Sequence, residues 1–465
     1  MHTASRGLGT IRPWLFGVIL AVTAACAPPP TEGSEGATEE SEAFAVREQG
    51  LVDLSSIDPA RELFMNDVSV VDDTRYTNWG GKSDQDPEGG WSFGRLIDNM
   101  MPEPMRNPCG RSQFVLNWLR TWESDQTVNG QVIPARPLIR SLIIDPWRTA
   151  SGCTGSDSTC ALDMAKAPFR LLAIVYRPDL RRVPTSSDPG MAGQGRFVFG
   201  VLGASGERLP FTVIFEYRLP IQYNSDILTW AQRWHALSNF PFGPGYNEML
   251  FAVTRTFTRR NAMPGQVNGS ALLQLRTNEV PLSPVEPKLW EMREFVLNSS
   301  TGQLKPVTVK QEVRASLNGT PALGAWVAGN ASAILAGTHV VPNTWQGQPF
   351  QAAAAPVPST LAWVVPGVTE EVRHAFAQAT CSGCHRSETP TIFLHVRTRD
   401  AGSPSLLSAF LTEQLSPTGF RMTDFLALLN TPTPDRVTNG FGSDHRWRKF
   451  KGSGRQSGNG SDDDD

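Results

Sequence analysis

The 465-residue sequence has no long apolar run beyond its first 25 residues, little net charge and none of the common catalytic motifs. A membrane-spanning helix needs about 20 consecutive apolar residues, so a bundle of such helices is not indicated. The formal net charge of −3 predicts no general attraction to nucleic acid, and we expect no nucleic-acid partner. Gly-x-Ser-x-Gly, Walker and His-Glu-x-x-His motifs are missing, so familiar hydrolase or nucleotide chemistry is not indicated.

The first 25 residues have the organisation of a signal peptide. Arg6 and Arg12 form a basic start, a short apolar run covers residues 14–22, and small residues precede Cys26. The run is too short to cross a bilayer. This segment resembles the lipobox of bacterial lipoproteins, which implies cleavage before Cys26 and lipidation of its thiol. Thr23 stands where that pattern usually has Leu, so cleavage by the ordinary signal peptidase is the alternative.

The resemblance implies an exported protein that its N-terminal lipid anchors to the cell envelope, at the outer membrane or the periplasmic face. Residues 26–45 are rich in Pro, Glu, Ser and Gly and cannot bury a core, which predicts a disordered tether. Residues 451–465 are Gly/Ser-rich and acidic, and we expect them to be a disordered tail.

Six cysteines are present, and an exported chain meets an oxidising compartment where disulfides form. Cys153 and Cys160 bracket six small polar residues, so this spacing favours a disulfide between them. Cys109 then has no assigned partner. A bridge from Cys109 to one of these two cysteines is the alternative.

Residues 46–365 form the predicted body of the protein. Up to about residue 165 the sequence is predicted to be largely irregular. β-Branched and aromatic runs bounded by Pro or Gly predict strands over residues 169–176, 196–202, 211–217, 271–276, 291–297 and 306–310. Apolar residues at helical spacing predict helices over residues 113–122, 226–237, 246–257 and 321–339. Grouped strands, then helices, then strands predict an α+β fold with a large mixed β-sheet.

Five segments of the body resemble a group of uncharacterised exported bacterial lipoproteins. They are Ala167–Leu180, Gly195–Leu202, Phe211–Pro220, Leu275–Asn278 and Trp290–Phe295. The resemblance covers most of the body and implies a shared fold, but it implies no activity. Many members of the group also resemble this chain in ending with a Cys-x-x-Cys-His segment.

Cys381-Ser-Gly-Cys384-His385 is the motif that carries chemistry. A helix is predicted from Thr369 straight into it. Two thiols three residues apart on a helical turn face the same side, where each can form a thioether to a porphyrin vinyl group. His385 can then ligate the iron. The motif therefore predicts one covalently bound haem c, and residues 366–450 resemble a small, mostly helical cytochrome c domain.

The second axial ligand is left open by the sequence. Met422 precedes an apolar helix predicted over residues 423–429 and would match the Met of simple electron-transfer cytochromes, although no Pro adjoins it. His395 would give iron with two His ligands, and an open site is the third possibility. Without haem, Cys381 and Cys384 could form a disulfide, or could bind zinc together with His385 and His395.

These observations predict a membrane-tethered lipoprotein that transfers electrons in the bacterial envelope to or from a redox partner protein. One alternative is a non-redox surface or periplasmic binding lipoprotein whose Cys-x-x-Cys-His segment is a disulfide or a zinc site. The other is a haem enzyme with an open distal site. The sequence does not indicate a ligand or an activity for residues 46–365.

Overall fold

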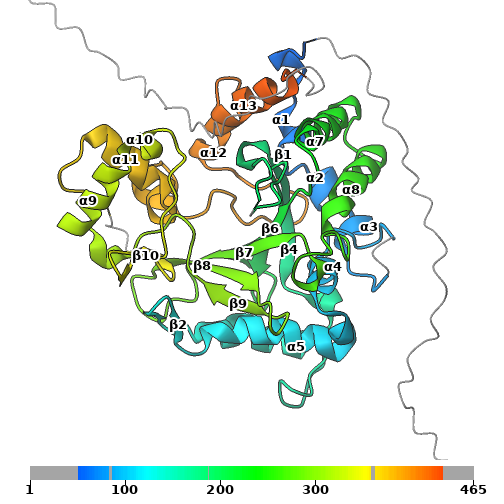
Figure 1. Cartoon of the computed structure of the whole chain (residues 1–465). Helices are drawn as coiled ribbons and strands as arrows, with labels where there is room; N and C mark the ends of the chain where they lie inside the picture. The colour runs from blue at the N-terminus through cyan, green and yellow to red at the C-terminus, as the bar shows by residue number, and fades with distance from the viewer. Residues whose placement is uncertain (1–50, 83–85, 187, 358–361, 433–465) are drawn as a thin grey trace, which may run out of the picture. The chain divides into compact units, whose positions relative to one another are not determined.

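The computed structural model describes residues 51–82, 86–186, 188–357 and 362–432 (Figure 1). The predicted signal peptide, Cys26, the tether and the acidic tail lie outside the described residues. In the part of the chain that is described, no helix has both the length and the hydropathy needed to cross a membrane.

An eight-stranded sheet runs through the described chain. In spatial order its strands are β1 (Phe64–Met65), β4 (Phe169–Arg177), β5 (Gln194–Leu202), β6 (Arg208–Arg218), β7 (Leu272–Glu279), β8 (Trp290–Leu297) and β12 (Ala355–Val357), and β9 (Leu304–Val307) also pairs with β8. Two short ribbons join β2 (Gln126–Val128) to β3 (Gln131–Ile133), and β10 (Thr344–Trp345) to β11 (Gln348–Pro349).

The prediction of a mixed sheet is wrong in one respect, because every strand pairing in the described residues is antiparallel. The strands from β4 to β9 follow one another both along the chain and across the sheet, so no crossover creates a parallel pair. β8 and β9 form a hairpin, whose turn is closed by a hydrogen bond from Gly302 N to Asn298 O.

The helices are α1 (Pro59–Glu62), α2 (Val68–Val71), α3 (Thr74–Thr77), α4 (Phe93–Met100), α5 (Pro108–Leu119), α6 (Asp145–Ala150), α7 (Ser225–His235), α8 (Pro244–Thr258), α9 (Pro321–Gly329), α10 (Ala331–Leu335), α11 (Glu370–Ala379), α12 (Ala409–Gln414) and α13 (Phe420–Leu429). Many begin at a side chain that accepts a backbone hydrogen bond, as Asp58, Ser92, Thr320 and Thr369 do. The mixture of helices and a large sheet confirms the α+β prediction.

Two local predictions differ from the structure. The stretch before residue 165 is not irregular, since α1 to α6 lie within it. Short helices capped by Asp, Ser or Asn carry too little apolar periodicity to be recognised in sequence. The Ala-rich segment 321–339 is not one helix, because Asn330 leaves the helical conformation (φ −114°, ψ 12°) between α9 and α10.

One face of the sheet carries an aromatic core. Phe93 on α4 stacks on Phe169 of β4 with ring centroids 3.9 Å apart, and meets Phe199 and Phe215 edge to face. These four side chains are buried and belong to the largest apolar cluster, to which α5, α7 and α8 also contribute. Interlocking aromatic rings of this kind bury large areas, so this face supplies much of the stabilisation.

The opposite face is lined by both polar and apolar side chains and is covered by the end of the described chain. Arg399 ties the loop before α12 to the sheet, because its guanidinium donates to Leu171 O and pairs with Asp72 at 2.6 Å. Val396 and Leu411 of this segment pack with Leu172 and Val198 of the sheet in a separate apolar cluster. Phe425 of α13 instead reaches the large aromatic cluster, where it packs edge-on against Tyr176 with ring centroids 5.8 Å apart. Residues 366–432 thus share their contacts with the body, and the described residues after Gly50 group as one unit.

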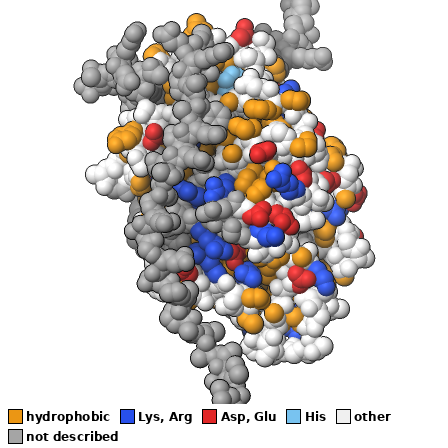
Figure 2. Space-filling view, turned by 90° about the vertical axis from the view of Figure 1, so that its right-hand side faces the viewer, with side chains coloured by type: hydrophobic (Ala, Val, Ile, Leu, Met, Phe, Trp, Pro, Cys, Tyr) orange, Lys and Arg blue, Asp and Glu red, His pale blue; other side chains and the backbone are white. Residues whose placement is uncertain are grey.

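Figure 2 views the molecule from the right-hand side of Figure 1, where α7 and α8 lie. Apolar, basic and acidic side chains are interspersed on this face, and the basic ones gather near its middle next to acidic ones. No large surface of a single sign of charge is visible there, which agrees with the small net charge of the chain.

Candidate functional site

A cavity of about 1340 Å³ lies on the polar face of the sheet. Strands β4 to β8 supply one wall, and α11, α13 and the loops between them supply another. Cys381, Cys384, His385 and His395 all line it. Pockets for drug-sized ligands usually measure about 300–1,000 Å³, so this cavity is large enough for a group of haem size.

The helical turn that carries the motif is separate from α11. Thr380 is extended (φ −78°, ψ 151°), so the prediction of a helix running straight into Cys381 is wrong. The Thr380 Oγ1 accepts a hydrogen bond from Gly383 N at 2.9 Å and caps the new turn. A Cβ on Gly383 would lie 2.0 Å from Ala377 O, so only glycine is tolerated there.

The His385 ring is fixed by a hydrogen bond at one nitrogen and by stacking on one face. Its Nδ1 donates to the Phe393 carbonyl at 2.5 Å, and its ring stacks on Trp290 with centroids 4.8 Å apart. Phe393 has a φ of +60°, which is uncommon for a bulky residue and is often found at functional sites. No described residue hydrogen-bonds to Nε2 of His385. Burial lowers the pKa of His385 to about 4, so this nitrogen keeps its lone pair at neutral pH.

Both motif cysteines are free thiols. The Cys381 Sγ lies 3.8 Å from Lys310 O, and the Cys384 Sγ lies 3.4 Å from the His395 Nε2. Burial raises the pKa of both thiols, that of Cys384 to about 11, so the neutral form is favoured.

The remaining cysteines lie away from this cavity. Cys153 and Cys160 are joined by a disulfide, which is the pairing that their spacing favours, and Cys109 is free and exposed.

His395 lies beside His385 in edge-to-face contact, with ring centroids 4.4 Å apart. Its Nδ1 is 2.9 Å from the Ser408 Oγ and 3.3 Å from the Thr391 Oγ1. A metal between two imidazoles occupies two bonds of about 2 Å, which puts the ring centroids farther apart than 4.4 Å. The two rings would therefore have to separate before iron could lie between them, and the prediction that His395 is the second ligand stays open.

Met422 is buried on the other side of α13. It belongs to the large apolar cluster, with 2% of its surface exposed, whereas its neighbours Arg421 and Thr423 line the cavity. The structure brings together Cys381, Cys384, His385 and His395 but not Met422, whose role as a ligand also stays a prediction. Among the described residues, no group of three or more His, Cys, Asp and Glu is close enough to hold a metal ion.

Charged side chains on the cavity wall are the part of the site that sequence reasoning missed. Arg196 faces Glu216 across β5 and β6 at 3.2 Å, and Arg276 faces Glu294 across β7 and β8 at 3.0 Å. Charged residues at alternate positions of otherwise apolar strands were the available signal, because such positions point to one face.

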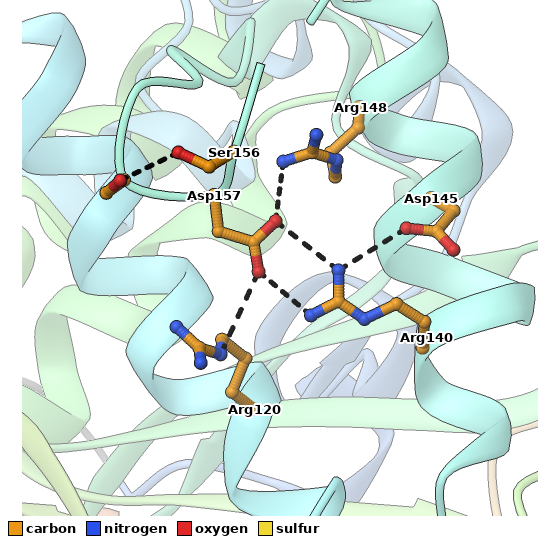
Figure 3. A pocket seen from close by; sticks show the side chains of 7 residues that line it. Arg120, Arg140, Asp145, Arg148, Ser156 and Asp157 are labelled. Carbon is orange, nitrogen blue, oxygen red and sulfur yellow. Dashed lines mark hydrogen bonds and ion pairs between the residues drawn. The ribbon is translucent and has the colours of Figure 1, made fainter. Parts of the chain in front are cut away.

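A second, smaller pocket lies at the surface near the disulfide (Figure 3). Asp157 sits among three arginines and is 2.5 Å from Arg148, 2.8 Å from Arg140 and 3.8 Å from Arg120. Figure 3 shows these side chains converging on the Asp157 carboxylate. Hydrogen bonds from Arg140 are the main reason that the pKa of Asp157 is lowered. Because Asp157 lies in the disulfide loop, the cluster holds that loop against the neighbouring helices.

Comparison of the chain with protein-family models, with curated proteins and with solved structures finds no match. The resemblance to exported lipoproteins and the resemblance to a cytochrome c domain stay expectations from sequence. What the cavity does must therefore be inferred from its own residues.

Proposed function

We propose that this protein is an exported, lipid-anchored electron-transfer protein with one c-type haem bound in the cavity. Cys381 and Cys384 would attach the haem, and Nε2 of His385 would ligate its iron. The observation that carries the proposal is that these three side chains line one cavity large enough for the group. The lipid anchor at Cys26 and the signal peptide are proposed from sequence alone, since they lie outside the described residues.

The state of His385 supports this assignment. An iron-ligating imidazole needs one nitrogen with a free lone pair and a hydrogen bond that orients the other nitrogen. In His385 the Nδ1 hydrogen goes to Phe393 O, and the ring is buried and neutral. Stacking on Trp290 further restrains the ring.

The neutral thiols support thioether attachment over a zinc site. Each thiol would add across a vinyl group: its S–H bond breaks, a C–S bond forms, and the hydrogen passes to the other vinyl carbon, so no oxidant is consumed. A thioether is uncharged and suits a buried position, whereas zinc binding requires thiolates. The raised pKa values of Cys381 and Cys384 oppose thiolate formation.

The bound haem would accept and release one electron. The chain would contribute a buried setting, the His385 imidazole as an iron ligand, and a charged wall that would adjust the stability of the oxidised state. A redox partner protein in the envelope would supply or receive the electron.

A haem enzyme with an open distal site is the second candidate. The placement of Met422 in the apolar cluster favours it, because that side chain faces away from the cavity. His395 supplies a neutral imidazole inside the cavity, where it could hold or move a proton. Carbon monoxide binding to the reduced protein would distinguish the two candidates, since only an open or readily opened site takes it up.

The test of haem attachment is a pyridine haemochrome spectrum of the full chain, produced with the c-type haem attachment machinery and then denatured. We expect a c-type α-band that is lost in Cys381→Ala/Cys384→Ala. Cys109→Ala is the matched control, because Cys109 is an exposed free thiol and its loss should leave the band unchanged. A colourless wild-type protein would rule out covalent haem and favour a non-redox binding lipoprotein.

A further inference from the structure

The cavity wall carries more positive than negative charge. Of the described residues that line it, seven are Lys or Arg and five are Asp or Glu, an excess of two cations. Lys310 and Arg182 are about half exposed, so solvent screens their charge, whereas an unpaired cation deeper in the wall would be stabilised by an anion. In the surface pocket, by contrast, each arginine around Asp157 has a carboxylate partner.

Most of the cavity cations are already paired. Arg177 forms a two-pronged pair with Asp179 at 2.5 and 2.8 Å, and Arg276 pairs with Glu294. Arg196 contacts Glu216 at 3.2 Å, but its hydrogen bonds go to the uncharged Gln194. These pairs account for the cations that lie along the strands.

Arg421 is different. It stands in the first turn of α13 and lines the cavity, yet no hydrogen bond or ion pair to a described residue fixes its guanidinium. Burial, together with repulsion from Arg177 and Arg196, lowers the pKa of Arg421 to about 9. Burial and the positive charges of Arg177 and Arg276 likewise lower the pKa of Arg196 to about 10, against the attraction of Glu216. The Asp179 carboxylate already attracts both guanidinium groups, and a further anion beside Arg421 would stabilise its charged form.

The site lies beside the motif. Arg421 and Arg177 both act electrostatically on Cys384 and on His395, while Arg276 acts on Cys381 and His385. The guanidinium fork matches a carboxylate with two parallel hydrogen bonds, which makes carboxylates the favoured anions.

We propose that Arg421 and Arg196 form a carboxylate-binding site inside the cavity, and that its occupants are the two propionates of the haem. This inference rests on the proposed haem attachment. A diffusible dicarboxylate has the same chemistry and is the other source of such groups. Arg421 and Arg196 would be positioning residues, which hold the ring plane relative to His385.

The experiment compares wild-type full-length protein with Arg421→Gln, Arg196→Gln and the control Arg140→Gln, whose arginine belongs to the surface cluster. Circular dichroism first establishes that each variant is folded, and Arg421→Lys provides a variant that retains the charge without the fork. The readouts are the propionate bending band in the resonance Raman spectrum and the midpoint potential.

If the propionates occupy the site, the Raman band shifts in Arg421→Gln and Arg196→Gln, and the midpoint potential falls, because a nearby cation stabilises the reduced state. Arg421→Lys should keep the potential near that of the wild type while still shifting the band, and Arg140→Gln should change neither. If a diffusible carboxylate occupies the site, the band is unchanged, but calorimetric titration with succinate gives saturable binding that Arg421→Gln weakens roughly tenfold or more.

A colourless wild-type protein would overturn the proposed function, and succinate titration of that protein would still test the carboxylate site. An unchanged Raman band and an unchanged potential in both glutamine variants, together with no succinate binding, would overturn the carboxylate site while leaving haem attachment intact.

Discussion

On β6, Phe215 packs in the aromatic core while the next residue, Glu216, faces the cavity. Phe197 and Arg196 divide in the same way on β5. A strand sends successive side chains to opposite faces, so one run of residues builds both a packed core and a polar wall. The residues that stabilise the sheet therefore lie on one face and the residues that line the cavity lie on the other, although the two kinds alternate along the sequence.

The two faces also differ in the interactions between their side chains. On the aromatic face the side chains pack as rings, whereas on the cavity face oppositely charged side chains pair across neighbouring strands. Cross-strand ion pairs stabilise a sheet only modestly. We therefore expect substitutions on the aromatic face to affect folding, and substitutions on the cavity face to affect the proposed haem site.

The largest effect should come from Phe215→Ala. Phe215 is fully buried among aromatic rings, so we expect the free energy of unfolding to fall by about 3–5 kcal/mol. Ile214→Ala is the matched control on the cavity face of the same strand, and it should cost only about 1–2 kcal/mol because Ile214 is half-buried. Urea denaturation measures both. Equal losses would contradict the division between the faces.

An intermediate effect concerns Glu312, which accepts a hydrogen bond from Ser382 N at 3.0 Å beneath the motif. Burial raises the pKa of Glu312 to about 7 from an ordinary value of 4.5. Between these values the folded state holds the proton more tightly, so stability falls as pH rises from 4.5 to 7. Glu312→Gln keeps a hydrogen-bond acceptor but cannot ionise. The decrease in the free energy of unfolding over this pH range should therefore be smaller in the variant by up to about 3 kcal/mol.

Urea denaturation at pH 4.5 and pH 7.5 measures the difference. Glu370→Gln is the control, since Glu370 is exposed and its pKa is lowered by its hydrogen bonds to Arg373. A pH dependence in Glu312→Gln equal to that of the wild type would show that the buried carboxyl is not its source.

The smallest effect should come from Arg140→Gln in the surface cluster. Arg140 pairs with Glu123 and Asp157 but is about one-third exposed, so we expect a loss of at most about 1 kcal/mol. Its haemochrome spectrum should equal that of the wild type. Thermal unfolding monitored by circular dichroism measures the loss, and a drop several times larger would mean that this cluster, too, is essential to the fold.

Sequence reasoning recovered most of the body. Strands β4 to β8 and helices α5, α7 and α8 occur where β-branched runs and helical spacing predict them. It failed for the short helices before residue 165 and for the antiparallel order of the sheet. Local patterns reveal elements of several residues, but pairing direction depends on contacts between distant segments.

The candidate site divides in the same way. The Cys-x-x-Cys-His spacing singled out Cys381, Cys384 and His385 directly, because a pattern of three residues within five positions is a local feature. Arg421 and Arg196 could not be found this way, since they are 225 positions apart and only the fold places both on the wall of one cavity. The side of α13 on which Met422 lies was equally hidden.

The sequence by itself determined the short-range features: the disulfide loop between Cys153 and Cys160, the capped start of α11 and the identity of the motif. Each depends on residues a few positions apart, so spacing and side-chain chemistry suffice. Only the tertiary structure decided which charges face the motif, and that Thr380 interrupts the helix before Cys381. These depend on long-range packing, in which α11, α13 and the sheet must all be in place before a cavity exists.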